Sequence, residues 1–398
     1  MSFHAGMWLQ KLRTELSGAL FLKYLLWQTR PALIKAHLAK KLYPSPLDNN
    51  PHSENKQNPG VTAHTPGLTD ESEPFPNGQN CGKVRVAAIQ SRLTLVENVL
   101  EYVDTMYLHT AEAVAKGADL LVFPEDNATQ LLGLLPGISN LPREANLNKA
   151  LASLGDTQLS AGDVFSYLTP VTRQVYFTTF GELARRFGVY IMGGSIIIRQ
   201  DGAISNSQGT LQKQVVNAAY LFAPSGEPVG QQVKAHLLPV EAEWGISCGC
   251  DLQVYSTPLG NLAFPVCMDA TYFETFRILA NRGADIILVP TANPDRYNFW
   301  KALRGAWPRV QETPVYGVTS ALVGEVLGME LTGRAGVFAP LELTPNGDGV
   351  LAQAPDPHQE AVVVADLDLK ALRQYRKESQ IWERLNRKLV AKYLPEYY

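Results

Sequence analysis

KGADLLVFPE (residues 116–125) and RGADIILVPT (residues 282–291) are two versions of one phrase within a single chain. In each, Gly-Ala-Asp leads into a short aliphatic run, and the two glycines lie 283 − 117 = 166 residues apart. A short aliphatic run between a turn and a proline is typical of a buried strand. The repetition predicts two related halves within one domain, each built from a strand, a helix and a strand.

Strand and helix patterns alternate on both sides of these phrases. Apolar runs predict strands at 84–90, 120–123, 189–198, 215–222, 262–266 and 361–368. Helical spacing of apolar residues predicts helices at 96–116 and 273–282, and a charged helix at about 369–392. This order predicts one large α/β domain over residues 83–398, ending in a helical tail.

The first 82 residues differ in composition from the rest. Residues 8–41 place apolar side chains at helical spacing between basic ones, and Pro31 is expected to kink or divide that helix. We therefore expect a basic amphipathic helical extension at 1–43 and a Pro-rich linker at 44–82. A basic helix of this kind can lie on an anionic membrane or contact a partner, or it can pack on its own domain or a sister subunit.

Composition excludes several classes of protein. Lys and Arg total 35 against 38 Asp and Glu, so the chain has no overall field for binding nucleic acid. The apolar run at 16–27 is shorter than the roughly 20 residues that span a bilayer, and neither it nor its flanks resemble a signal peptide. Four unevenly spaced cysteines do not make a disulfide scaffold, so we expect a cytoplasmic protein.

Three reactive side chains each lie close to the end of a predicted strand. Glu125 follows the run LLVFP, where partial desolvation can raise the pKa of a carboxylate towards that of a useful base. Lys234 opens the block KAHLLPVE (234–241), and Cys267 follows the run LAFPV (262–266). Because a helix is predicted soon after Cys267, its positive end is expected to favour the thiolate, which makes this residue a candidate nucleophile.

Four ordered blocks carry a family resemblance: VRVAAIQ (84–90), GADLLVFPE (117–125), KAHLLPVE (234–241) and CMDATYFE (267–274). In these blocks the chain resembles the nitrilase, or carbon–nitrogen hydrolase, superfamily. The likeness continues through Asn217, Arg309 and Glu312 and covers about 84–368. It implies a four-layer α-β-β-α sandwich, to which this chain adds the N-terminal helical extension. We expect no cofactor and no metal, and a homo-oligomer.

The resemblance also implies roles for individual residues. Cys267 would attack the substrate carbon, Glu125 would act as general base, and Lys234 would stabilise the developing negative charge. A second carboxylate would orient Lys234 or the water, and both Glu241 and Glu243 are candidates. Four residues are candidates for the pocket wall: Glu243, Trp244, Met268 and Tyr272. The segment 136–175 is longer than is usual in the family, which suggests a lid or an oligomer contact.

The expected activity is hydrolysis of a non-peptide carbon–nitrogen bond, with a small linear amide as substrate. Two alternatives use the same residues: hydrolysis of a nitrile, and transfer of the acyl group to an amine. A nitrilase is expected to carry Trp directly after the nucleophile, and Met268 in that position favours an amidase. An alternative from another class is a non-catalytic scaffold that docks through residues 8–41.

Overall fold

The structure is a computed structural model, and it describes residues 15–41, 82–141, 147–152, 160–200, 214–302, 304–379 and 386–396. Cys81, residues 8–14 of the predicted N-terminal helix and residues 44–81 of the predicted linker lie outside the described residues. The principal helices are α2 (Glu15–Gln28), α3 (Pro31–Ala39), α4 (Val99–Ala115), α5 (Leu147–Ala152), α6 (Ala161–Phe187), α7 (Pro239–Glu243), α8 (Phe273–Asn281), α9 (Phe299–Ala302), α10 (Ala306–Glu312), α11 (Leu369–Glu378) and α13 (Arg387–Tyr393).

The strands follow the predicted order, with additional short ones between them. They are β1 (Lys83–Arg92), β2 (Leu120–Val122), β3 (Tyr190–Gln200), β4 (Gln214–Phe222), β5 (Pro228–Val233), β6 (Ile246–Ser247), β7 (Tyr255–Thr257), β8 (Gly260–Ala263), β9 (Ile286–Thr291), β10 (Tyr316–Val326), β11 (Met329–Leu331), β12 (Gly336–Phe338), β13 (Val350–Gln353) and β14 (Ala361–Asp368). Their hydrogen-bonded order is β5-β4-β3-β2-β1-β10-β9-β8-β7.

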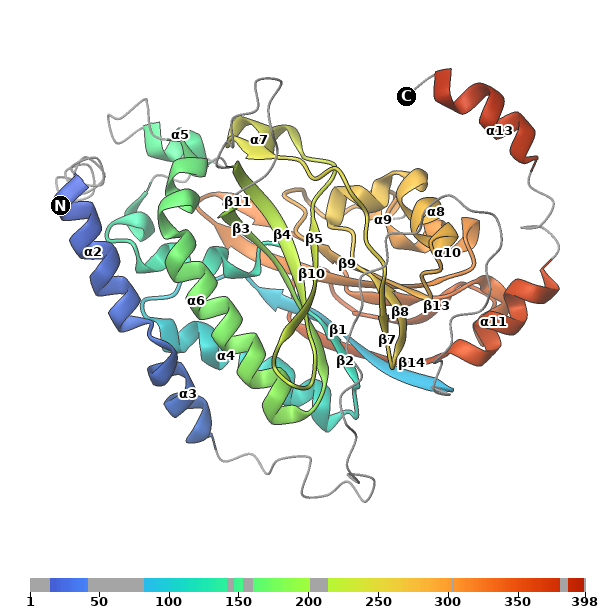
Figure 1. Ribbon diagram of the computed structural model, residues 1–398, viewed down its shortest axis with the longest axis horizontal. Helices are drawn as coiled ribbons and strands as arrows, with labels where there is room; N and C mark the ends of the chain where they lie inside the picture. Colours follow the sequence, from blue (N-terminus) through green and yellow to red (C-terminus); the bar gives the residue numbers. More distant parts are fainter. Residues whose placement is uncertain are drawn as a thin grey trace.

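Strand β1 joins two halves of this sheet (Figure 1). On one side β1 runs parallel to β2, which in turn runs parallel to β3. On the other side it pairs with β10 only over Gln90–Arg92, whereas β14 pairs with it in antiparallel fashion over Lys83–Gln90. Because β1 and β10 are joined over so short a length, the two halves can separate and face one another.

Alternation along the strands sends side chains into three main apolar cores, which separate four layers. Val86 of β1 and Leu288 of β9 lie in the core between the two half-sheets. The neighbouring Ala87 points the other way, into a core that includes residues of α4 and α6. Val289 of β9 likewise points away from the centre, into a core that includes residues of α8 and α10. This is the predicted α-β-β-α sandwich.

The repeated Gly-Ala-Asp phrase makes the same contacts in both halves. The Asp119 carboxylate accepts a hydrogen bond from the backbone N–H of Arg85 at 2.9 Å, and the Asp285 carboxylate accepts one from the N–H of Asn261 at 3.1 Å. The glycine of each phrase has a positive φ, +80° in the first and +88° in the second. Each aspartate thus fastens the start of its strand to the strand before it, and the predicted internal repeat is present.

The N-terminal helices pack on the chain's own domain. They are divided before Pro31, as predicted, and α2 and α3 run beside α6 (Figure 1). Leu25, Ile34 and Leu38 are buried in the same core as residues of α4 and α6. The Tyr167 hydroxyl of α6 also donates a hydrogen bond to a backbone carbonyl of α2, at 2.6 Å. Of the alternatives for this segment, contact with its own domain is therefore realised.

Two predicted segments differ from the structure. Residues 161–175 form the first half of α6 and bury Val164 and Phe165 in the core, so they are an integral helix of the domain; an oligomer contact through this segment stays a prediction. The charged C-terminal helix is divided, since α11 ends at Glu378 and α13 begins at Arg387. Helix propensity alone could not show either result, because each depends on tertiary packing. No helix in the described part of the chain is long and apolar enough to cross a membrane.

Candidate active site

Glu125 lies where the two half-sheets meet. The chain leaves β2 through buried Phe123, and the Glu125 carboxylate is itself buried. Its Oε2 accepts a hydrogen bond from the backbone N–H of Ala292, just past β9, at 2.9 Å. The backbone here is closely packed, because a Cβ on Gly194 would come within 1.9 Å of the Pro124 carbonyl oxygen. The Gly-Gly pair at 193–194 thus has a packing role.

Lys234 lies directly after β5 and bridges two carboxylates. Its Nζ is 2.7 Å from Oε1 of Glu125 and 2.5 Å from Oε2 of Glu241, and its side chain is only 1% exposed. Glu241 is held on α7, where it also accepts the backbone N–H of Leu238 at 2.8 Å. Glu243, two residues on, is exposed. The geometry therefore identifies Glu241 as the second carboxylate beside Lys234.

Cys267 begins a short 3-10 turn, Cys267–Thr271, with its backbone in the left-handed region at φ +44°. Asp269 in that turn ties it to the lysine loop. Its fully buried carboxylate accepts the N–H of Val266 at 2.9 Å, and the N–H and ring Nδ1 of His236 at 2.7 and 2.8 Å. His236 is two residues after Lys234, so this carboxylate fixes the thiol turn and the lysine loop relative to one another.

The electrostatics of the thiol correct the prediction of a favoured thiolate. Burial, followed by the charge of Glu125, raises the pKa of Cys267 well above its usual range, although Lys234 opposes the shift. The helix α8 begins only at Phe273, after the 3-10 turn. Desolvation therefore outweighs the attraction of Lys234 and favours the protonated thiol.

The pKa values of both Glu125 and Lys234 are raised. Burial raises the pKa of Glu125, with the charge of Lys234 opposing and that of Glu241 adding to the shift. For Lys234, burial acts to lower the pKa, but the nearby charges of Glu125, Cys267 and Glu241 raise it well above its usual value. The ammonium thus stays protonated, while Glu125 becomes a stronger base than an exposed carboxylate.

Two further residues join the cluster that sequence reasoning had not placed there. The Asn217 side-chain amide on β4 donates to Oε1 of Glu125 at 3.1 Å, to Oδ1 of Asp126 at 3.3 Å and to Oε1 of Glu241 at 3.2 Å. Burial and the charges of Glu125 and Glu241 raise the pKa of Asp126 well above its usual range. Two features of the sequence could have indicated these residues: Asn217 lies in a stretch that shares the family likeness, and Asp126 directly follows Glu125.

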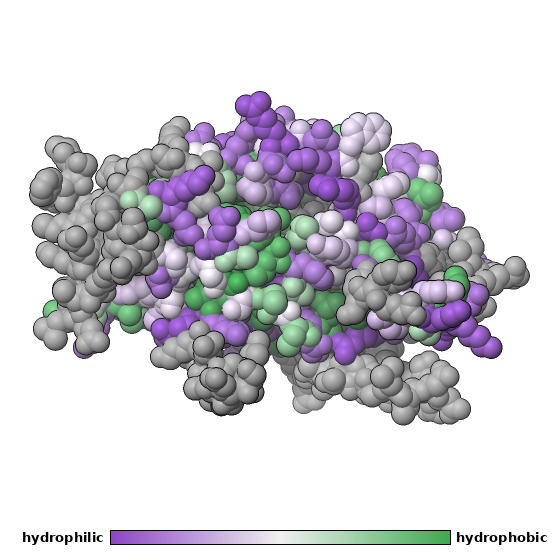
Figure 2. Space-filling model, turned by 90° about the horizontal axis from the view of Figure 1, so that it is seen from above, coloured by the Kyte–Doolittle hydropathy of each residue, from purple (hydrophilic) through white to green (hydrophobic). Residues whose placement is uncertain are grey.

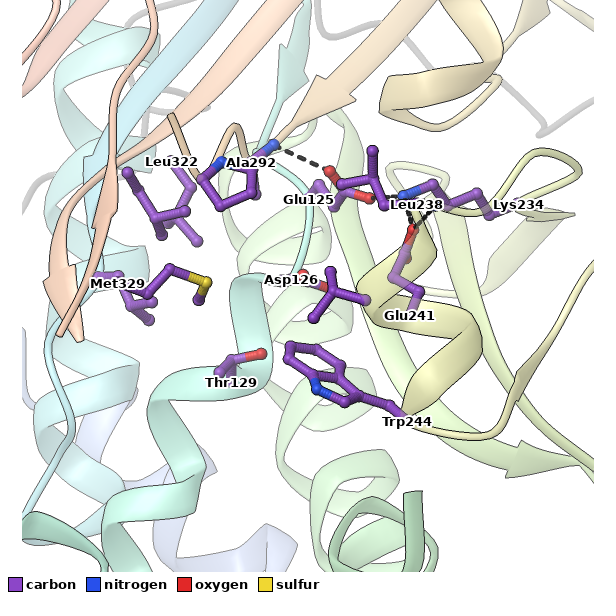
Figure 3. A pocket seen from close by; sticks show the side chains of 14 residues that line it. Glu125, Asp126, Thr129, Lys234, Leu238, Glu241, Trp244, Ala292, Leu322 and Met329 are labelled. Carbon is purple, nitrogen blue, oxygen red and sulfur yellow. Dashed lines mark hydrogen bonds and ion pairs between the residues drawn. The ribbon is translucent and has the colours of Figure 1, made fainter. Parts of the chain in front are cut away.

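A small cavity of about 40 Å³ opens beside these groups (Figure 3). One water molecule needs roughly 10–15 Å³ of such cavity volume, so the space holds about three waters. Apart from Glu125, Asp126, Lys234, Glu241 and Thr129, the lining is apolar: Leu93, Leu238, Val240, Trp244, Ala292, Pro294, Leu322, Met329 and Leu331.

Of the residues predicted for the pocket wall, the structure places only Trp244 there. Glu243, Met268 and Tyr272 are absent from the lining, and the Tyr272 ring instead lies 4.4 Å from that of His236. The predictions rested on proximity in sequence, and the turn at Cys267 directs this stretch elsewhere.

The molecular face on the side of α7, seen from above in Figure 2, has an apolar centre surrounded by hydrophilic side chains.

Comparisons with known proteins agree with this geometry. The carbon-nitrogen hydrolase family model matches residues 85–377. The chain is 28% identical over 303 residues to a probable hydrolase of Bacillus subtilis, covering 75% of this chain but only 52% of that protein. It is 26% identical over 293 residues to a nitrilase of Pyrococcus abyssi, covering 74% of this chain and 93% of the relative.

A solved structure shares the fold. It is a mutant of an amidase of the nitrilase superfamily from Nesterenkonia, with a TM-score of 0.50 and 22% identity, covering 76% of this chain and 97% of that one. The family model itself covers well over half of the chain, in the region that holds the buried lysine and its carboxylates. The chain therefore belongs to the carbon–nitrogen hydrolase family.

Proposed function

We propose that this carbon–nitrogen hydrolase cleaves a small neutral amide through a thioester on Cys267. The observation that carries the proposal is the bridging position of Lys234 between Glu125 and Glu241, with Cys267 near enough for the charges of Glu125 and Lys234 to shift the pKa of its thiol. A nucleophile, a base and a positive charge are thereby assembled within one buried cluster.

In the first half-reaction Glu125 takes the proton of the Cys267 thiol as sulfur attacks the amide carbon. The negative charge that develops on the carbonyl oxygen is stabilised by the Lys234 ammonium. Glu125 then gives the proton to the departing nitrogen, the carbon–nitrogen bond breaks, and ammonia leaves a thioester behind. Because the thiol has a raised pKa, a base already in contact with it is required for this step.

In the second half-reaction water replaces the amine. Glu125 takes a proton from the water as its oxygen attacks the thioester carbon, and the same proton returns to sulfur when the carboxylic acid is released. Glu241 holds the ammonium in place throughout, through its contact of 2.5 Å with Lys234 Nζ. Asn217 positions both carboxylates by donating to each of them.

The pocket supports a neutral acyl group. Its cation, Lys234, already contacts two carboxylates, and Asp126 adds a further acid to the wall. A substrate carboxylate would therefore enter without a free positive partner, at the cost of desolvating a charge. The remaining wall is largely apolar, and the cavity is small, which favours a short aliphatic chain.

Ammonia release from a panel of purified substrates tests the proposal. Propionamide and butyramide should be hydrolysed faster than succinamic acid, an amide of similar length that carries a carboxylate, and faster than N-carbamoyl compounds or propionitrile. Cys267→Ala should abolish the release. A nitrile preferred over its amide, or hydroxamate formation with hydroxylamine that exceeds hydrolysis, would support the alternative reactions of the same residues. Ammonia release that survives Cys267→Ala would contradict the mechanism itself.

A cytoplasmic location forms part of the same proposal. Cys248 and Cys250 are exposed and free, and the proposed nucleophile is also a free thiol. Thiols in these states persist in a reducing compartment.

A further inference from the structure

The outer face of α2 carries a row of apolar side chains. Leu20, Tyr24 and Trp27 are 63%, 53% and 58% exposed, and spacings of four and three residues place them on one side of the helix. The other side of α2 carries Leu25 into the core. A helix with apolar side chains on two opposite sides normally has both sides shielded from water. The outer row of α2 therefore indicates a binding surface for another molecule.

Positive charge accompanies this row. Residues 16–43 contain no Asp or Glu, and they contain five basic residues, Lys23, Arg30, Lys35, Lys40 and Lys41. Lys35 and Lys41 form ion pairs with acids of the main domain, whereas Lys23 and Lys40 are exposed. The guanidinium of Arg30 lies 4.5 Å from the centre of the Trp27 ring. The exposed apolar row therefore lies in a basic segment without acids, with one cation, Arg30, directly beside Trp27.

We propose that α2 and α3 dock on the surface of an anionic phospholipid bilayer. Tyr24 and Trp27 are of the types that favour the boundary between headgroups and acyl chains, because each ring has an apolar body and a polar tip. The neighbouring lysines are attracted to anionic headgroups, and the absence of acids over residues 16–43 leaves that attraction unopposed within the segment. The helices lie on the membrane and do not cross it.

Charge argues against a second copy of the chain as the occupant. A two-fold contact would place this face against the same face of the partner. Lys23, Arg30 and Lys40 would then face a segment of the partner that is also basic and has no acidic side chain in residues 16–43 to compensate. Like charges brought together across an interface oppose association, whereas a layer of phosphate groups neutralises them.

Vesicle co-sedimentation of the full chain tests the inference. The vesicles contain phosphatidylcholine alone or phosphatidylcholine with phosphatidylglycerol, at low salt and again at high salt. The test variant combines Leu20→Ser, Tyr24→Ser and Trp27→Ser. The matched control combines Phe299→Ser and Trp300→Ser, which removes the two exposed aromatic rings of α9, 50% and 72% exposed. Oligomeric state is measured by light scattering for each protein, and amide hydrolysis shows that each is folded.

Wild type and the control should sediment with the anionic vesicles, less at high salt, and only weakly with phosphatidylcholine alone. The triple variant should bind at least about tenfold less while retaining hydrolysis, because three apolar contacts with the bilayer are removed. The inference is overturned if wild type does not bind anionic vesicles, or if the triple variant binds them as well as the control. It is also overturned if the triple substitution instead converts an oligomer to a monomer with no change in vesicle binding.

Discussion

Replacing Lys234 with methionine tests how the buried cluster is held together. Methionine keeps most of the volume and the flexible stem but removes the ammonium. Nζ lies 2.7 Å from Glu125 and 2.5 Å from Glu241, and all three side chains are at most 5% exposed. Removing one partner from buried ion pairs of this kind leaves uncompensated charge, which costs about 3–5 kcal/mol. We expect a loss of unfolding free energy in that range near neutral pH.

The pH dependence of the loss follows from the carboxylates. Burial already raises the pKa of Glu125 in the wild type, and removing the cation that opposes this shift raises it further. A group whose pKa is raised on folding stabilises the folded state below its unfolded pKa, and that contribution disappears as the pH rises through the folded pKa. Lys234→Met should therefore lose less stability near pH 5, where Glu125 binds its proton more readily, than near pH 8.

Urea unfolding at the two pH values, followed by tryptophan fluorescence, measures this effect. The matched control is Lys35→Met, because Lys35 is 56% exposed and pairs with Glu182 at 3.0 Å. An exposed ion pair contributes less than about 1 kcal/mol, so this variant should change little at either pH. The reasoning is refuted if Lys234→Met loses no more than Lys35→Met, or if its loss is equal at both pH values.

Three further substitutions follow from contacts of single residues. Asp269→Asn leaves one acceptor oxygen for the donors of Val266 and His236, so the thiol turn and the lysine loop should shift. We expect kcat to fall about 10–100-fold with little change in KM. An unchanged kcat would show that the carboxylate does not position the nucleophile. Asn217→Ala removes a hydrogen-bond donor to Glu125, so the ionised carboxylate is less stabilised and its pKa should rise. The acidic limb of the plot of kcat/KM against pH should therefore move to higher pH. A fall in rate with no movement of that limb would indicate a purely structural role. Ile34→Ala should lower the free energy of unfolding by about 2–5 kcal/mol, because the Ile34 side chain is completely buried. The control is Leu20→Ala, at an exposed position of the same segment. Equal losses in the two variants would mean that the N-terminal helices do not share the core.

The sequence predicted those features that depend on local pattern and on strand direction. The repeated Gly-Ala-Asp phrase predicted two related halves, and in both halves its aspartate, Asp119 or Asp285, accepts a backbone N–H from the preceding strand. Glu125, Lys234 and Cys267 could be grouped because each lies close to the end of a strand, and the family resemblance joined them. The structure brings these three side chains into one cluster.

Other features depend on distances that no local pattern contains. Whether Glu241 or Glu243 reaches the lysine is decided by which side of the short helix α7 is buried. The direction of the Cys267 pKa shift depends on desolvation by residues distant in sequence, so the expected thiolate was wrong. Asn217 on β4 reaches Glu125 and Asp126, which follow β2 two strands away in the sheet, and Glu241 on α7. That arrangement is a property of the complete sheet.

The left-handed backbone at Cys267 has a consequence for how this enzyme could change over time. A residue with a side chain at φ +44° carries conformational strain of about 1–3 kcal/mol, which glycine would avoid. A chain that did not need a thiol here could gain stability by replacing Cys267, the proposed nucleophile, with glycine. Under the proposed mechanism, activity and stability are thus opposed at a single residue.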